Sequence, residues 1–180
     1  MRGNIIVKAI GNWNGYQYIT AVSRDNGYTF TQIGGTAVSG DGDLLYNFAA
    51  FHPQNSNIVY IGNFRFDNIQ NSNTFTTLYR PIKAMWAGNG DIVYSSSGNI
   101  IYKSTDKGAT WTTPYPTMAD GHDTHSVAVD PTNQNRLYIG SKGRGVYIIN
   151  DTVANGGTMT LKNASHGFEA DGYGSINVGP

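Results

Sequence analysis

The stretch Ser104-Thr105-Asp106-Lys107-Gly108-Ala109-Thr110-Trp111 decides how this sequence is interpreted. Its pattern, S-x-D-x-G-x-T followed by an aromatic residue, also occurs upstream as Ser23-Arg24-Asp25-Asn26-Gly27-Tyr28-Thr29-Phe30. Two copies of one eight-residue pattern in a chain of 180 residues indicate an internal repeat. We therefore look for a repeat architecture before considering individual elements.

Each copy of the pattern predicts a β-hairpin turn. An Asp in a turn accepts hydrogen bonds from backbone N–H groups a few residues further on. The Gly two positions later adopts a positive φ at little cost, and the Thr and the aromatic residue then begin the next strand. We therefore expect these acids to be structural and not catalytic. The residues given this structural role are Ser23, Asp25, Gly27, Thr29, Phe30, Ser104, Asp106, Gly108, Thr110 and Trp111.

The pattern resembles the Asp-box, or BNR repeat, of the sialidase-like and xyloglucanase-like (glycoside hydrolase family 74-like) β-propellers. The resemblance implies that the two turns lie on the outer, non-catalytic side of a propeller. It also implies that ligands meet the opposite face. That face is formed by the loops from strand two to strand three of a blade and from strand four to the next strand one.

A second repeat supports the same period. The segment Phe51–Gly62 aligns with Val129–Gly140, and both contain the pattern x-Pro-x-Asn-x-Asn before an apolar run. The separation of Asp25 from Asp106 equals two repeats of about 40 residues, close to the length of one propeller blade. We predict a tight loop between strands one and two of a blade at each Pro-containing segment.

These patterns predict an all-β fold, a β-propeller of about four four-stranded antiparallel blades, either complete or part of a larger ring. No stretch shows a helical period over ten or more residues. The first blade is one strand short, and the Gly-rich tail contains one strand candidate, Gly174–Val178, that could complete a blade. The single module 1–180 divides into blades at approximately 3–35, 44–79, 80–116 and 122–163, with the tail at 164–180.

Composition limits the class of function. Twelve basic residues balance twelve acidic ones, which argues against nucleic-acid binding because that requires a basic face. The absence of cysteine excludes thiol chemistry and disulfides. The 23 Gly and 12 Tyr, with many Asn, Ser and Thr, are typical of extracellular, cell-surface and virion proteins. We expect no cofactor, no metal and no membrane span.

The N-terminus lacks a convincing signal peptide, so the chain either has no cleavable leader or is a piece of a longer protein.

The segment that leads into the fourth blade is the most suggestive ligand site. It contains His122, Asp123 and His125, residue types that bind metals or act as acid and base. Lys142 and Arg144 lie in the facing loop of the same blade. These cations have the chemistry to bind a carboxylate or sugar hydroxyls, or else to form a surface ion pair with Asp123.

Four further residues are candidates by position. Asp41 and Asp43, flanked by glycines, lie in the loop between the first two blades, where a solvated turn is the simpler interpretation. Arg65 follows the loop between strands two and three of the second blade. Trp13, in Gly11-Asn12-Trp13-Asn14-Gly15, is the aromatic residue best placed to stack on a sugar ring.

The resemblance does not supply an active site. The arginine triad of sialidases cannot be placed on this sequence, and Glu occurs once, at Glu169. We therefore expect a non-catalytic binding or structural propeller module that faces glycan or protein in a surface or virion assembly. The alternative is a fragment of an Asp-box glycoside hydrolase, sialidase-like or xyloglucanase-like. In a xyloglucanase-like site Asp123 or Asp41 would be one of two carboxylates, the other coming from another domain. Self-association or a longer chain would then complete the ring.

Overall fold

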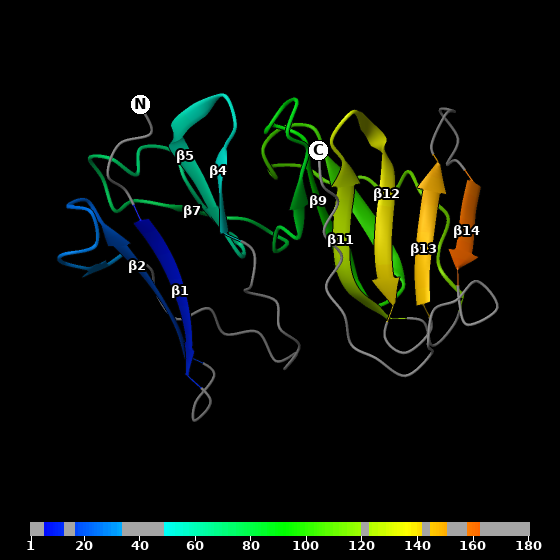
Figure 1. Ribbon diagram of the computed structural model, residues 1–180, viewed down its shortest axis with the longest axis horizontal. Helices are drawn as coiled ribbons and strands as arrows, with labels where there is room; N and C mark the ends of the chain where they lie inside the picture. The colour runs from blue at the N-terminus through cyan, green and yellow to red at the C-terminus, as the bar shows by residue number, and fades with distance from the viewer. Residues whose placement is uncertain are drawn as a thin grey trace. The chain divides into compact units, whose positions relative to one another are not determined.

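The computed structural model describes residues 6–12, 17–33, 49–119, 123–141, 145–150 and 158–162. Within these residues all regular structure is β, in four antiparallel sheets (Figure 1), which confirms the all-β class. Sheet 1 contains β1 (Ile6–Asn12), β2 (Gln17–Ser23) and β3 (Thr31–Gln32); sheet 2 contains β4 (Ala49–His52), β5 (Asn55–Ile61), β6 (Phe64–Phe66) and β7 (Thr76–Thr77); sheet 3 contains β8 (Ala84–Met85), β9 (Val93–Ser97) and β10 (Ile100–Ser104); sheet 4 contains β11 (Thr124–Asp130), β12 (Asn133–Ser141), β13 (Gly145–Asn150) and β14 (Thr158–Lys162).

The Ser23–Phe30 turn connects β2 to β3 and is closed by side chains. The carboxylate of Asp25 accepts hydrogen bonds from the Ser23 hydroxyl at 2.7 Å, the Thr29 backbone N–H at 2.9 Å and the Thr29 hydroxyl at 2.5 Å. The Ser23 hydroxyl in turn accepts the N–H of Gly27 at 2.8 Å. The hydrogen bond from the Thr29 side chain is the largest of the effects that lower the pKa of Asp25 to about 2.

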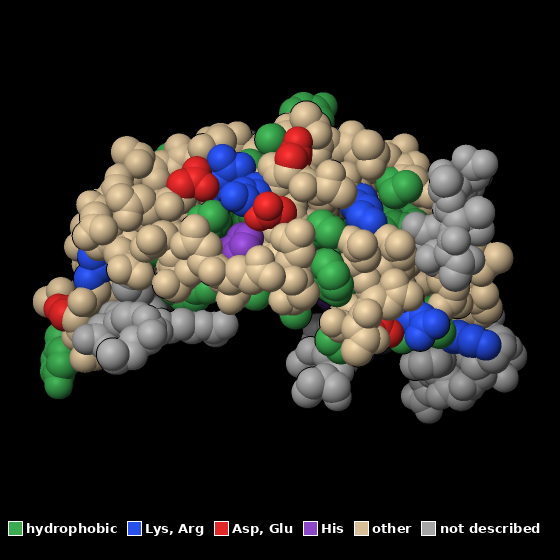
Figure 2. Space-filling model, turned by 90° about the horizontal axis from the view of Figure 1, so that it is seen from above, with side chains coloured by type: hydrophobic (Ala, Val, Ile, Leu, Met, Phe, Trp, Pro, Cys, Tyr) green, Lys and Arg blue, Asp and Glu red, His purple; other side chains and the backbone are tan. Residues whose placement is uncertain are grey.

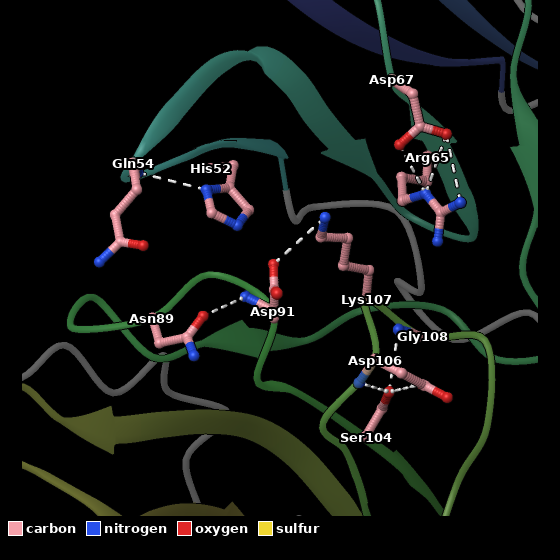
Figure 3. Close-up of polar contacts among 10 residues, drawn as sticks. All are labelled: His52, Gln54, Arg65, Asp67, Asn89, Asp91, Ser104, Asp106, Lys107 and Gly108. Atoms are coloured by element: carbon pink, nitrogen blue, oxygen red, sulfur yellow. Dashed lines mark hydrogen bonds and ion pairs between the residues drawn. The ribbon is translucent and has the colours of Figure 1, made fainter.

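The Ser104–Trp111 turn repeats this arrangement after β10 (Figure 3). Asp106 accepts a hydrogen bond from the Ser104 hydroxyl at 2.7 Å. It also accepts hydrogen bonds from the N–H and the hydroxyl of Thr110 at 2.8 and 2.6 Å. The Gly108 N–H donates to Ser104 at 2.9 Å, and Gly108 has the positive φ of 83° that favours glycine. Burial is the largest single influence on the Asp106 carboxyl and raises its pKa, but the hydrogen bonds together lower the pKa to about 2.

The two Pro-containing turns between the first and second strands of sheets 2 and 4 are also equivalent. In sheet 2 the Nδ1 atom of His52 accepts the Gln54 N–H at 3.2 Å (Figure 3), and in sheet 4 Asp130 accepts the Thr132 N–H at 2.8 Å. After each turn an Asn side chain accepts a backbone N–H two residues later. Both second strands therefore begin at Asn55 and Asn133, inside the x-Pro-x-Asn-x-Asn segments for which a loop was predicted.

Sheet 1 lacks an inner strand among the described residues. Because the Ser23–Phe30 turn follows β2 as the Ser104–Trp111 turn follows β10, β1 and β2 correspond to the second and third strands of a complete sheet. In sheet 3 the fourth strand is reduced to one bridge, in which Lys103 and Thr112 exchange backbone hydrogen bonds of 2.9 and 2.8 Å. Whether the first blade is one strand short stays a prediction, because residues 1–5 and the tail 164–180 lie outside the described residues.

The chain divides into two compact units, Met1–Ile82 and Lys83–Pro180, each with its own core. In the first unit Val22 and Ile33 of sheet 1 pack with Phe64 and Phe66 of sheet 2. The second unit is built around Tyr94, Ile101, Leu137, Ile139 and Ile149, which fill the space between sheets 3 and 4. The members of this second cluster are the main apolar contribution to the stability of sheets 3 and 4.

Candidate ligand-binding loops

Two connections between neighbouring sheets are held by the same pair of backbone hydrogen bonds. After sheet 2, the N–H of Leu78 donates to the carbonyl of Asn63 at 2.7 Å and the N–H of Ile82 donates to the carbonyl of Gly62 at 2.8 Å. After sheet 3, Met118 donates to Asn99 at 3.0 Å and Thr124 donates to Gly98 at 2.9 Å. We call the enclosed segments, 79–81 and 119–123, the clamped loops.

A Gly-Asn pair forms the base of each clamp. Gly62 and Gly98 occupy the tight turns between the second and third strands of sheets 2 and 3, with φ values of 54° and 53°. Residues other than Gly and Asn rarely adopt this left-handed region, so the turns favour glycine. Each clamp thus joins the turn between strands two and three of one sheet to the connection that leads from its last strand to the next sheet. These are the two kinds of loop that we expect to share a ligand face.

Asp123 lies at the end of the second clamped loop. Its side chain is exposed, and none of the described residues hydrogen-bonds to its carboxylate. A methyl group placed on Gly98 would lie 3.8 Å from Asp123 Oδ1, so the carboxylate lies close above the Gly98 turn. The next residue, Thr124, fixes this position because both its N–H and its hydroxyl donate to the Gly98 carbonyl at 2.9 Å.

His125 occupies an irregular position in β11. Thr124 pairs with Ser141 and Ser126 with Gly140, so His125 is the extra residue of a β-bulge. Bulges bend a strand and redirect the side chain at the irregular position, and they often occur beside functional sites. The imidazole is partly buried and is therefore less accessible than the Asp123 carboxylate.

Arg65 is engaged within its own sheet. Its Nε atom lies 2.9 Å from Asp67 Oδ1, and Nη2 donates to Asp67 Oδ2 at 3.2 Å (Figure 3). The residue alternates with the buried Phe64 and Phe66 along β6, so its side chain leaves the sheet on the face away from the core. The ion pair draws the guanidinium toward the Asp67 end of the strand, away from the Gly62 turn.

Several sequence-predicted candidates lie outside the described residues. These are Trp13, Asp41, Asp43, His122, Lys142 and Arg144. The structure therefore brings together Asp123, Thr124 and the Gly98 turn, and leaves the other predicted partners of Asp123 as expectations. Among the described side chains, no group of three His, Asp or Glu residues is arranged to hold a metal ion.

The first clamped loop contains two residues that the sequence analysis did not select. Tyr79 is 85% exposed, and the guanidinium carbon of Arg80 lies 5.2 Å from the centre of the Tyr79 ring. Tyrosine directly after a strand is usually a packing residue, so composition alone gave no reason to choose it. The available signal was the repetition of Gly-Asn at Gly62 and Gly98, which marks equivalent turns.

The described surface carries few charges. In Figure 2 acidic and basic side chains lie near one another in a surface made mostly of neutral atoms. Such a surface suits a neutral ligand better than a polyanion, which binds to a continuous basic patch. In the part of the chain that the structure describes, no helix is long and apolar enough to cross a membrane.

Comparison with known proteins adds a family likeness. The chain is 30% identical to a xyloglucanase of Hypocrea jecorina, in an alignment that covers 75% of this chain and 17% of the relative. It superimposes on a GH74 enzyme of Niastella koreensis with a TM-score of 0.60 and 21% identity, covering 88% of this chain and 28% of that one. An ancestral GH74 enzyme gives a TM-score of 0.50 at 20% identity, covering 84% of this chain and 23% of that one. No protein-family model matches the chain.

These likenesses show the fold. The chain consists of the repeated antiparallel sheets of a β-propeller and is similar to the GH74 enzymes in this respect. It spans 17% of the curated relative that it matches and about a quarter of the two solved structures.

Proposed function

We propose that this chain forms part of the propeller of a xyloglucanase-like glycoside hydrolase and that its clamped loops contact the glycan. The observation that carries the proposal is the 30% identity to a xyloglucanase over three quarters of the chain. The described parts of the clamped loops support it, because the exposed side chains of Tyr79 and Asp123 lie next to backbone groups that hydrogen bonds hold in place. The Ser23–Phe30 and Ser104–Trp111 turns fit the Asp-box of such propellers and would act as scaffold. The site of action would then be extracellular, where xyloglucan occurs.

Asp123 is the carboxylate that we assign to the reaction. Most glycoside hydrolases use two carboxylates on either side of the scissile bond. Asp123 is exposed, is held beside the Gly98 turn and has none of the structural bonds that engage Asp25 and Asp106. The second carboxylate would come from a part of the protein beyond this sequence.

Hydrolysis assays test this proposal. We expect the chain, alone or together with the remainder of its protein, to release reducing sugar from xyloglucan. Asp123→Asn should lower the rate by about 100-fold or more, as loss of a general acid or base does. The matched control is Asp91→Asn, because Asp91 is an ion-pair partner of Lys107 at 3.5 Å and has no assigned role in the reaction. Absence of both binding and hydrolysis of xyloglucan would contradict the proposal.

A non-catalytic glycan-binding module is the second candidate. Apart from Asp123, the described aspartates are all engaged: Asp25, Asp106 and Asp130 in turns, and Asp67 and Asp91 in ion pairs. This scarcity of available acids favours binding without turnover. Xyloglucan binding that persists in Asp123→Asn, with no reducing sugar released by the unmodified protein, would support this candidate and not the first.

A further inference from the structure

Tyr79 is one of two strongly exposed tyrosines among the described residues; the other is Tyr28. Four tyrosines, Tyr60, Tyr94, Tyr115 and Tyr147, are buried in sheets and their connections. Tyr79 is 85% exposed, although the residues on either side of its loop, Leu78 and Ile82, are buried. Its ring gains nothing from the hydrophobic effect in water and can therefore gain from contact with the apolar face of a ligand.

The loop that carries Tyr79 is held rigidly. Its two ends are fixed by the hydrogen bonds to Asn63 and Gly62, and Pro81 restricts the backbone between them. A ring on such a short, anchored segment loses little conformational freedom when a ligand binds. This preorganisation distinguishes Tyr79 from an exposed aromatic residue on a loose surface loop.

The neighbours of Tyr79 have the chemistry of a sugar site. Arg80 stacks on the ring, which orients both side chains and brings N–H donors beside it. The aromatic ring and the guanidinium together match the apolar face and the hydroxyls of a pyranose.

We infer that Tyr79 and Arg80 form a stacking platform for one pyranose ring of a neutral glycan. The inference deepens the proposed function, on which it rests, by naming a substrate contact at the loop equivalent to that of Asp123. The ring would bind one apolar face of the sugar, while Arg80 would hydrogen-bond to its hydroxyls. Tyr79 is a binding residue here and takes no part in bond cleavage.

Calorimetric titration of the unmodified chain with xyloglucan oligosaccharides tests the platform. We expect Tyr79→Ala to weaken binding by about tenfold, which corresponds to about 1.4 kcal/mol and lies within the range of an aromatic stacking contact. Tyr79→Phe should retain most of the affinity because the ring remains. The matched control is Tyr28→Ala, which removes a tyrosine that is 86% exposed but lies in the Ser23–Phe30 turn. The melting temperatures of Tyr79→Ala and Tyr28→Ala should stay near that of the unmodified chain, because exposed side chains contribute little to stability.

Each other outcome has a distinct meaning. Binding that is equal in Tyr79→Ala and the unmodified chain would overturn the platform and leave the proposed function standing. An equal loss in Tyr28→Ala would also overturn it, because the effect would then not depend on the clamped loop. If the unmodified chain neither binds nor hydrolyses xyloglucan, the proposed function fails and the platform fails with it.

Discussion

The guanidinium of Arg24 donates two hydrogen bonds to the carbonyl oxygen of Ile69, from Nε at 3.0 Å and from Nη2 at 2.8 Å. The same Nη2 atom reaches the carbonyl of Ser72 at 3.1 Å and the side chain of Asn73 at 2.8 Å. Arg24 thereby joins the turn of sheet 1 to the longer turn between β6 and β7 of sheet 2. Residues 67–73 do not contain the S-x-D-x-G-x-T pattern, and Arg24 adds these bonds to the internal ones of the turn, in which the N–H groups of Asn71 and Ser72 donate to the carbonyl of Asn68.

Arg24→Ala should destabilise the protein measurably. The substitution leaves the carbonyl of the buried Ile69 without these two donors, and loss of hydrogen bonds from a charged group costs about 1.5–3 kcal/mol. The measurement is the free energy of unfolding from urea denaturation. Thr105→Ala is the matched control, because Thr105 holds the equivalent position in the second turn, and the change should lie within about 0.5 kcal/mol. Equal losses in the two variants would contradict the assigned role of Arg24.

Acid should weaken the two S-x-D-x-G-x-T turns over a defined range of pH. Hydrogen bonds, led by that from the Thr29 side chain, lower the pKa of Asp25 from 3.8 to about 2, and the pKa of Asp106 also falls to about 2. The folded state therefore binds fewer protons than the unfolded state between these values. The stabilisation is complete above about pH 4 and is lost as the pH falls through about 2. The melting temperature should fall as the pH is lowered from about 4 to about 2. This fall should be smaller in a protein that carries both Asp25→Asn and Asp106→Asn. An unchanged pH dependence in that variant would show that other groups control acid unfolding.

Gly98→Ala should disturb the clamped loop that carries Asp123. Gly98 has a φ of 53°, and an L-residue with a Cβ in this region costs about 1–2 kcal/mol. The added methyl group itself has room, since its nearest neighbour is Asp123 Oδ1 at 3.8 Å. We therefore expect lower thermal stability from backbone strain and not from a clash. Gly98→Asn is the control, because Asn tolerates a positive φ and should lose less stability. If Ala and Asn destabilise equally, the turn does not depend on the left-handed conformation.

The local turns could be predicted from the sequence because their bonds join residues close in the chain. Asp25 and Asp106 bind within four residues of themselves, so their patterns can be recognised without knowing the fold. The start of β5 at Asn55 was missed because a polar Asn reads as loop, although its side chain binds the N–H of Asn57 at 3.1 Å and prolongs the hairpin.

The clamped loops could not be predicted in the same way. Their bonds join backbone groups of residues far apart in the chain, such as Gly98 and Thr124, and a backbone group can be hydrogen-bonded with almost any side chain attached. Asp123 was selected for its charge and lies beside such a clamp. Tyr79 was passed over because a tyrosine next to a strand usually packs against the sheet, and its 85% exposure cannot be inferred from the sequence.

We predict that the tail supplies an inner strand to a sheet that, like sheet 1, has no inner strand among its described residues. Ser175-Ile176-Asn177-Val178-Gly179-Pro180 repeats the pattern of Ser126-Val127-Ala128-Val129-Asp130-Pro131, the segment that ends β11 and enters its turn. Among the described residues β1 pairs only with β2, so its other edge can accept a strand in the same chain or in a second copy.

A chain without residues 175–180 should melt at a lower temperature than the full sequence, because an inner strand contributes both hydrogen bonds and packing. Light scattering coupled to size-exclusion chromatography measures the molar mass, and so distinguishes a strand supplied by the same chain from one supplied by a second copy. A monomer that loses stability on truncation indicates pairing within one chain, and a dimer that dissociates on truncation indicates exchange between copies. As a control, Asn177→Pro should mimic the truncation, since proline removes a backbone donor from the strand. A truncated chain with unchanged melting temperature and mass would contradict the prediction.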